Sequence, residues 1–449
     1  MAPSRLRASR PLVTVLVVAA AVLAGCGGRA DREAPRAEPV PTPSSSPSST
    51  AAPTSRHLVV VGHSTRPQLD LTAAEARRLT SGAMTRWRGL RVVTGQSARR
   101  TIATVGREPR TLGAVPLEAV GPTVVAARVD GVDPVRDRAG ALDLTVVGDV
   151  MLARGVTDPA AALAPMSALL RRADLTVGNL ESTLSRRGAP TQGGDSFGAG
   201  PELLGPLRSA GFDALSLANN HAGDFGTGAL LDTVRELRSS PIVPFGAGGD
   251  LADASRPAIV ERGGVRFGFV GFNAIGETPQ AGEGRPGALS VRMPPRTGPL
   301  SRPDLDHVLG VVRRTARQAD VVVVLPHWGT QYTHTPEPVQ RQVGRELVRA
   351  GADLVVGGHP HWVQGIDAVR AAPVLHSLGN FVFDMDFMEQ TMEGVVLQAT
   401  FWGPQLKAIR LLPYEMDPQS FAPRRVRGSE AAQILGDVWS TSTGPFVDR

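Results

Sequence analysis

Short apolar runs that stop abruptly at polar side chains constrain this chain more than any other feature. Five such runs recur between Asp143 and His361, with helical patterns between them. Apolar strands that alternate with amphipathic helices are typical of a layered α/β domain. In such sheets, the loops at the carboxyl ends of the strands meet in one crevice. The polar side chains that end the runs should therefore lie close together. They are Asp149, Glu181, Asn220 with His221, His327, and His359 with His361.

These side chains have the chemistry of a metal site. Oxygen and imidazole ligands suit Zn, Mn or Fe at a hydrolytic centre. Taken alone, an aspartate after glycine, such as Asp149, more often caps a helix, and a lone histidine such as His327 is more often structural. The run His359-Pro360-His361 is more specific, because an extended His-x-His places both rings near one point. Four histidines at strand ends strengthen the interpretation as a metal site beyond any one of them.

Composition narrows the class of protein. The 449 residues are 42% hydrophobic and 20% charged, which excludes a disordered chain and a polytopic membrane protein. The formal net charge is +6, and Arg5, Arg7 and Arg10 supply half of it in a segment without acids. The remainder is too small to indicate nucleic-acid binding. The single cysteine excludes an intrachain disulfide and a cysteine-based zinc site.

The N-terminus has the pattern of an export signal. Three arginines precede the 12-residue apolar stretch 12–23, and a bilayer-spanning helix needs about 20 residues. The following Leu-Ala-Gly-Cys26 resembles a bacterial lipobox. This implies that residues 1–25 are a lipoprotein signal peptide and that Cys26 is lipidated, which would hold the protein at the outer face of the cytoplasmic membrane. An ordinary cleaved signal and an uncleaved anchor are the alternatives.

Four further segments follow the signal. Residues 26–56 are rich in Pro, Ser and Ala, which predicts a disordered tether. Residues 57–138 predict a small α/β module that loosely resembles a fragment of a phosphate-type periplasmic binding protein; the alternative is an accessory module without a ligand. The main domain is expected over 142–413, followed by a C-terminal extension over 414–449.

Four helix boundaries, three starts and one end, can be predicted from one or two residues each. Thr72, with Glu75 three residues later, has the pattern of a capping box at a helix start. Proline begins the helical patterns predicted over 159–171 and 338–350, and glycine follows the second one.

Six ordered motifs carry a family resemblance. They read GDVML, GNLES, LANNHAGDFG, LPHWGTQY, GGHPHW and SLGNFVFD, and they resemble the CapA family, named for poly-γ-glutamate capsule synthesis. The resemblance covers about 142–413. That family is similar to the calcineurin-like metallophosphatases, which implies a four-layer α/β/β/α sandwich with a two-metal site.

The resemblance also implies roles for the strand-end side chains. Six of them would bind two divalent ions, expected to be Mn, Zn or Fe: Asp149 and His361 the first ion, Asn220, His327 and His359 the second, and Glu181 both. His221 would protonate the leaving group. Two metals that share a carboxylate lower the pKa of a bridging water and clamp the attacking and leaving oxygens, so the implied chemistry is hydrolysis.

The chain departs from the family pattern at three positions. Met151 stands where metallophosphatases have histidine, which leaves the first metal short of a ligand. Many CapA relatives carry glutamate in place of Gln331 and a second histidine in place of Gly358. Further candidates for the pocket or its support are Asn179, Gln331, Asn380 and Asp384.

Two functions are compatible with this pattern. The first is an exported metal-dependent hydrolase that acts on a phosphoester or on an amide-linked acidic polymer. The second is a non-catalytic lipoprotein that holds or guides an anionic polymer during synthesis or export, with a membrane-bound assembly as its partner. Arg154, Arg186 and Arg187 would attract a polyanion in either case, although surface arginines are usually only solvated.

Overall fold

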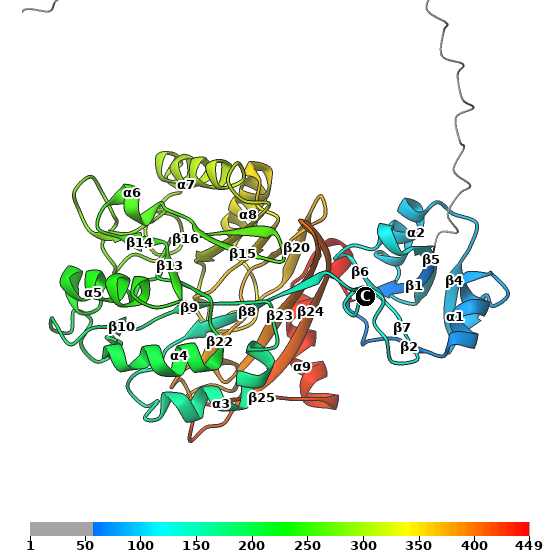
Figure 1. Ribbon diagram of the computed structural model, residues 1–449, viewed down its shortest axis with the longest axis horizontal. Coiled ribbons are helices and arrows are strands. Elements are labelled where there is room, and N and C mark those ends of the chain that lie inside the picture. Colours follow the sequence, from blue (N-terminus) through cyan, green and yellow to red (C-terminus); the bar gives the residue numbers. More distant parts are fainter. Residues whose placement is uncertain (1–56, 449) are drawn as a thin grey trace, which may run out of the picture. The chain divides into compact units, whose positions relative to one another are not determined.

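The computed structural model describes residues 57–448, which belong to one compact unit of mixed α/β structure (Figure 1). The α/β class is therefore confirmed. Cys26, the signal sequence and the tether lie outside the described residues. Every helix between residues 57 and 448 is too short or too polar to span a bilayer.

The N-terminal region forms a five-stranded sheet in the order β3-β4-β5-β1-β6. Its first helix begins with the predicted capping box between Thr72 and Glu75. The elements of this region are β1 (Leu58–His63), β2 (Asp70–Leu71), α1 (Ala73–Thr80), β3 (Arg86–Trp87), β4 (Leu90–Val93), α2 (Ala98–Val105), β5 (Thr111–Pro116), β6 (Val124–Ala126) and β7 (Arg128–Val129).

An eight-stranded sheet follows, in the order β13-β12-β9-β8-β23-β24-β25, with β22 also paired to β8. Its strands are β8 (Ala141–Val150), β9 (Leu175–Leu180), β12 (Ala214–Ser216), β13 (Val243–Phe245), β22 (Asn380–Val382), β23 (Glu393–Trp402), β24 (Gln405–Met416) and β25 (Pro423–Arg425). Strand β23 pairs with residues 141–146 of β8, and β22 takes over beside Asp149. This exchange brings Asn380 next to Asp149.

A six-stranded sheet has the order β15-β16-β18-β19-β21-β20. Its strands are β15 (Ala258–Arg262), β16 (Val265–Asn273), β18 (Val321–His327), β19 (Leu354–Val356), β20 (Ile366–Val369) and β21 (Ala372–Leu375). Strands β16, β18 and β19 run parallel, so their carboxyl ends lie at one edge of the sheet.

Alternating side chains of the strands face different cores, as the period of a strand requires. Val146 of β8 and Val323 of β18 belong to one buried cluster that both sheets share. Val147 of β8 faces a second cluster with α3 (Pro159–Leu170), α4 (Leu204–Ala210) and α5 (Gly226–Arg238). Val322 and Val324 face a third cluster with α7 (Arg302–Thr315) and α8 (Pro338–Ala350). Figure 1 shows these two helix groups on opposite sides of the sheets.

The helices α3 and α8 begin at the predicted prolines, and Gly351 ends α8 with a φ of 116°. Segments beyond Pro413 also join the main body, because β25 extends the eight-stranded sheet and α9 (Gly428–Ser440) contributes Ile434 to the shared core. The remaining short elements are β10 (Thr183–Leu184), β11 (Gly198–Ala199), β14 (Ala247–Gly248), α6 (Leu251–Ala254) and β17 (Gly287–Ala288).

Contacts tie the N-terminal region to the strands that follow it. Trp402 Nε1 donates a hydrogen bond to the carbonyl of Val135 (2.8 Å), and Lys407 Nζ donates one to the carbonyl of Glu118 (2.8 Å). Trp402 also packs against one of the two buried apolar clusters of the N-terminal region. The boundary near residue 140 stays a prediction, which a shortened chain beginning at Gly140 would test.

Candidate metal centre

The strand-end side chains meet at the carboxyl ends of both large sheets. Asp149 ends β8, Glu181 follows β9, and His327 ends β18, and their exposed fractions are 0, 0 and 2%. One ligand atom from each lies within 4.8 Å of the others, so the group could hold a metal ion. Strands β8 and β9 pair in parallel, so Asp149 and Glu181 lie at one edge of the eight-stranded sheet, and the packing of the two sheets brings His327 of the six-stranded sheet beside them.

Asn179 supports this group from β9. Its Nδ2 donates to Asp149 Oδ1 (2.8 Å) and Glu181 Oε1 (2.9 Å) and lies 3.1 Å from His327 Nδ1. Its Oδ1 accepts a hydrogen bond from Asn219 Nδ2 (2.9 Å). The amino group of Asn179 therefore holds one side of both carboxylates and leaves their other oxygens for further ligands.

His359 and His361 both have left-handed backbones, with φ of 94° and 60°. The backbone N–H of His359 donates to Asp149 Oδ2 (2.9 Å), while its two ring nitrogens are buried and have no hydrogen-bond partner. The ring centroid of His359 lies 4.9 Å from that of His327. His361 is held through Nδ1 by Asn380 Oδ1 (2.8 Å). Buried polar atoms without partners are rare and require an explanation, and an ion between these rings would supply one.

Electrostatics favour a cation at this point. Burial, together with the charge of Asp149, raises the pKa of Glu181 well above its usual value. Burial lowers the pKa values of His327 and His359 well below the usual value, which favours neutral rings, and the two nitrogens of His359 have no hydrogen-bond partner. Glu181 Oε2 has no hydrogen-bond partner, and its histidine neighbours are 3.6 Å or more away. A divalent cation would offset the repulsion between the carboxylates and use a lone pair of His359.

His221 lies beside this group and is oriented by a carboxylate. Its Nδ1 contacts Asp224 Oδ2 at 2.8 Å, and its ring stacks on Phe197 with centroids 3.8 Å apart. Asp224 is fully buried and also accepts the N–H of Phe197 (2.7 Å). The sequence interpretation missed Asp224, although its position three residues after His221 within LANNHAGDFG was a signal.

Asn220 links His221 to the metal ligands. Its Oδ1 lies 2.8 Å from His327 Nε2, and its Nδ2 lies 2.9 Å from His221 Nε2. The same Nδ2 donates to Glu277 Oε2 (2.7 Å). Glu277 was also missed, because it lies outside every recognised motif and no local pattern in its segment points to the site.

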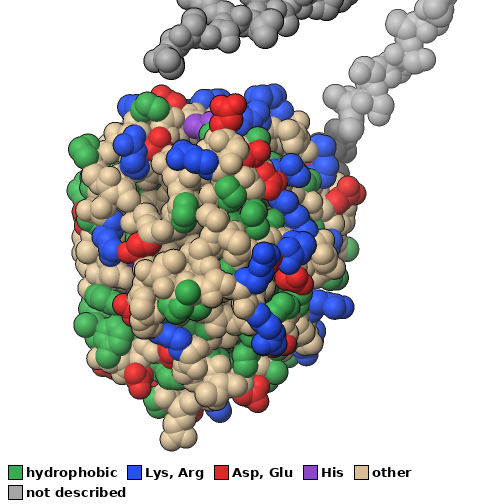
Figure 2. All heavy atoms as spheres, turned by 90° about the vertical axis from the view of Figure 1, so that its left-hand side faces the viewer, with side chains coloured by type: hydrophobic (Ala, Val, Ile, Leu, Met, Phe, Trp, Pro, Cys, Tyr) green, Lys and Arg blue, Asp and Glu red, His purple; other side chains and the backbone are tan. Residues whose placement is uncertain are grey.

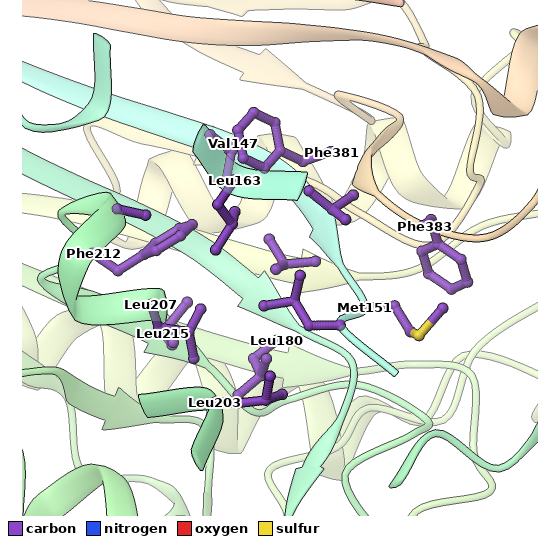
Figure 3. Close-up of a cluster of buried hydrophobic side chains, with 14 of the residues drawn as sticks. Val147, Met151, Leu163, Leu180, Leu203, Leu207, Phe212, Leu215, Phe381 and Phe383 are labelled. Carbon is purple, nitrogen blue, oxygen red and sulfur yellow. The ribbon is translucent and has the colours of Figure 1, made fainter. Parts of the chain in front are cut away.

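The two positions where histidine was expected cannot serve as ligands here. Met151 is fully buried in an apolar cluster beside Phe383, as Figure 3 shows. A Cβ added at Gly358 would lie 2.4 Å from Asp149 Oδ1, so the backbone approaches that carboxylate too closely for any side chain.

The outer candidates differ in how they relate to the centre. Gln331 Nε2 lies 3.3 Å from His361 Nε2, so this side chain reaches a candidate ligand. Asp384 instead accepts hydrogen bonds from the Arg154 guanidinium and from the N–H of Gly155 (2.9 Å). Asp384 therefore shapes the loop around Arg154.

The arginines expected to attract a polyanion are all paired. Arg154 binds Asp384, Arg186 lies 2.8 Å from Glu202, and Arg187 lies 3.2 Å from Asp232. On the face shown in Figure 2, basic and acidic side chains lie interspersed. Because carboxylates already pair with these three arginines, the arginines are less able to guide a polyanion to the centre.

Comparison with known proteins gives matches over the same region. A family model described as bacterial capsule synthesis protein PGA_cap matches residues 143–385. The capsule biosynthesis protein CapA of Bacillus anthracis is 30% identical over 313 residues, covering 66% of this chain and 73% of that protein. The PGA biosynthesis protein CapA of Bacillus subtilis (strain 168) is 30% identical over 267 residues, covering 57% and 67%. Among solved structures, a hypothetical protein from Thermus thermophilus matches with 19% identity and a TM-score of 0.39, covering 61% of this chain and 99% of that chain.

Proposed function

Because the chain belongs to the PGA_cap family of bacterial capsule synthesis proteins, we propose that it is a metal-dependent hydrolase of capsule or poly-γ-glutamate-type polymer metabolism. One observation carries the hydrolase part of this proposal. A buried set of oxygen and imidazole groups with the chemistry of metal ligands lies beside a histidine that a carboxylate orients.

We further propose two divalent ions, Mn, Zn or Fe, as the cofactors. Asp149, Glu181 and His327 would hold one part of the centre, and the free nitrogens of His359 and the free Oε2 of Glu181 support ligation beyond that group. The four-layer α/β/β/α sandwich belongs to the same proposal. The core shared by both sheets and the helix clusters outside each sheet support it.

The mechanism assigns proton transfer to His221. Asp224 accepts a hydrogen bond from the Nδ1–H of His221. The other ring nitrogen, Nε2, is then directed toward Asn220 and the ligand group. When Nε2 carries a proton, Asp224 stabilises the charged ring, and His221 can protonate the leaving oxygen or nitrogen of the substrate. Bound metal ions would supply Lewis-acid chemistry and activate water.

The alternative function is a scaffold that holds or guides an anionic polymer without cleaving it. The burial of Met151 in the apolar cluster favours this alternative, because it removes one ligand that a complete two-metal site would have. The pairing of Arg154, Arg186 and Arg187 with carboxylates weighs against it, because a polyanion would have to compete for them.

Metal analysis and turnover assays on the full-length chain separate the two functions. We expect Mn, Zn or Fe in the purified protein and hydrolysis of a phosphodiester or of a γ-glutamyl polymer. Absence of all three metals would contradict the hydrolase mechanism. Bound metal without turnover on any substrate of the panel would leave the scaffold function.

The proposal places the protein at the outer face of the cytoplasmic membrane, anchored through lipidated Cys26 and in contact with a polymer synthesis or export assembly. Cys26→Ser should release the protein from the membrane fraction and change the mass of its mature N-terminus. Retention in the membrane with an unchanged mass would contradict the anchor.

A further inference from the structure

Glu277 contacts a candidate metal ligand although it belongs to no recognised motif. We propose that Glu277 is a positioning residue that determines which atom of the Asn220 amide faces the metal centre. This inference rests on the proposed metal-dependent function and adds to it the group that selects an oxygen ligand.

The argument begins with the hydrogen bonds around the Asn220 amide. A carboxylate can only accept hydrogen bonds, so the atom that lies 2.7 Å from Glu277 Oε2 must be the amino nitrogen. The amide oxygen then necessarily faces His327 Nε2, 2.8 Å away. The orientation of a side-chain amide is assigned from such networks, and a carboxylate assigns it without ambiguity.

The other neighbours of the amide discriminate less strictly. An imidazole nitrogen can donate or accept, depending on the tautomer and charge of the ring. His327 Nε2 therefore suits either end of the amide. His221 Nε2, 2.9 Å from Asn220 Nδ2, accepts from the amino group only while the ring carries its proton on Nδ1. Glu277, by contrast, requires the amino group of Asn220 whichever nitrogen of His221 carries a proton.

The backbone holds Glu277 in an uncommon conformation for this contact. Its φ is 62°, in the left-handed region that glutamate rarely adopts and that clusters at functional sites. Thr278 Oγ1 accepts the N–H of Gly223 at 2.9 Å, which fastens the Glu277 turn to the loop that carries Asn220. Asn273 Nδ2 donates to the carbonyl of Gly276 (2.8 Å) at the other end of the same turn.

Arg296 completes the arrangement. Its Nη2 lies 2.5 Å from Glu277 Oε1, so the two oxygens of this carboxylate are divided between Arg296 and Asn220. The side chain of Glu277 is 28% exposed, which places the pair at the rim of the centre. Both neighbours are donors, so each oxygen of the Glu277 carboxylate accepts a hydrogen bond.

The consequence concerns metal affinity. A divalent ion is bound by the amide oxygen, whereas the amino group has no available lone pair. Without Glu277, the amide can turn its amino group toward the centre and replace an oxygen ligand with a donor. Loss of an outer-shell partner of a metal ligand typically costs about 10- to 100-fold in metal affinity.

The experiment compares three variants of the full-length chain by calorimetric titration with Mn²⁺ and Zn²⁺. Glu277→Ala should weaken binding by about 10- to 100-fold. Glu277→Gln should weaken binding as well, because Arg296 can only donate and takes the glutamine oxygen, which leaves the glutamine NH2 facing Asn220 and favours the wrong end of its amide. Glu283→Ala, which changes an exposed glutamate in the same loop region, is the matched control and should have no effect.

A second measurement reports the amide directly and needs no metal. The sequence contains five asparagines, so protein labelled with ¹⁵N-asparagine gives five side-chain amide pairs. The Asn220 signals should shift in metal-free Glu277→Ala and Glu277→Gln and stay in place in Glu283→Ala. Thermal unfolding of each variant confirms that it is folded.

The outcomes separate the inference from the proposed function. Unchanged affinity and unchanged Asn220 signals in Glu277→Ala would overturn the role of Glu277 and leave the metal centre intact. A parent protein that binds neither metal, but whose Asn220 signals respond to Glu277→Ala, would overturn the proposed metal function. The positioning of Asn220 by Glu277 would then stand.

Discussion

Two buried clusters of carboxylate and histidine lie in this molecule, and they differ in the source of their positive charge. In the first, Asp367 is 6% exposed and accepts hydrogen bonds from Arg341, His376 (3.1 Å) and Thr443 (2.6 Å). In the second, Asp149 and Glu181 are fully buried, and Glu181 Oε2 has no partner. The first cluster contains its own cation.

The pKa directions follow from this difference. Burial alone would raise the pKa of Asp367, but His376, Thr443 and Arg341 together lower it below the usual value. Burial and Asp149 raise the pKa of Glu181 well above the usual value. When the fold itself supplies the cation, as in the first cluster, removing the carboxylate destabilises the folded protein. When the fold supplies no cation, as in the second cluster, the buried carboxylate favours the binding of an ion from outside.

The largest effect should come from removing Glu181. Glu181→Ala should abolish metal binding, because it removes the proposed bridge and leaves two cations to repel each other. Unfolding of the metal-free variant should be no easier than that of the parent protein, since the mutation removes a buried charge without a partner. Metal per chain and chemical denaturation in EDTA measure both effects.

Glu202→Ala, at a surface pair with Arg186, serves as the control for Glu181→Ala. A Glu181→Ala protein that keeps its full metal content would contradict the proposed bridge. Strong destabilisation of its metal-free form would contradict the contrast with Asp367.

The second effect concerns turnover alone. His221→Ala should keep its metal, because His221 is proposed as a proton donor, while hydrolysis falls by about 10²–10⁴-fold. Asp224→Asn should lower turnover in the same direction, since Asp224 orients the ring. Parallel loss of metal and turnover in His221→Ala would show that His221 is a ligand instead.

The third effect concerns stability alone. Asp367→Ala leaves Arg341 and His376 without their carboxylate, and breaking such a pair costs about 3–5 kcal/mol when it is fully buried. Because the Arg341 side chain is 21% exposed, we expect about 3 kcal/mol, toward the lower end. Urea denaturation measures the loss, and unchanged metal affinity of the folded variant checks that this cluster acts independently of the centre.

The sequence predicted the strand ends well because their signal is local. An apolar run that stops at Asp149 or His327 shows both the strand and the polar residue that follows it. The capping box at Thr72 and the glycine that ends α8 are local in the same sense. Parallel pairing then brings the strand ends of each sheet to one edge, as the α/β class requires, and the packing of the two sheets brings the two edges together.

The parts of the site that the sequence did not predict depend on contacts between segments that are distant in the chain. Asn380 reaches Asp149 only because β22 replaces β23 beside β8. Glu277 reaches Asn220 through a left-handed turn whose geometry no sequence period reveals. One compositional signal was available and unused: four of the five asparagines of the chain lie at or just beyond the carboxyl ends of strands around the centre, and the fifth, Asn380, begins β22 beside Asp149. They are Asn179, Asn219, Asn220, Asn273 and Asn380.

The smallest effect tests a third buried carboxylate, whose charged neighbours are acidic. Glu393 is 3% exposed, and its Oε2 has no hydrogen-bond partner. Burial, together with Glu389, Asp437 and the directly opposed Glu415, raises its pKa from 4.5 to about 7. We therefore expect Glu393 to hold a proton, rather than a metal, at pH values below about 7.

The pH dependence of stability should show this proton. A group whose folded pKa is raised contributes stability below its unfolded pKa and loses it as the pH rises through the folded value, here between 4.5 and about 7. Glu393→Gln cannot ionise, so its unfolding free energy in EDTA should fall less than that of the parent protein between pH 5 and pH 8. Glu415→Gln removes the facing charge, which lowers the folded pKa of Glu393, so the decline should become smaller and end at lower pH. Parallel curves for Glu393→Gln and the parent protein would show that Glu393 is ionised throughout, and the distinction between a protonated carboxyl and a metal ligand would then need another basis.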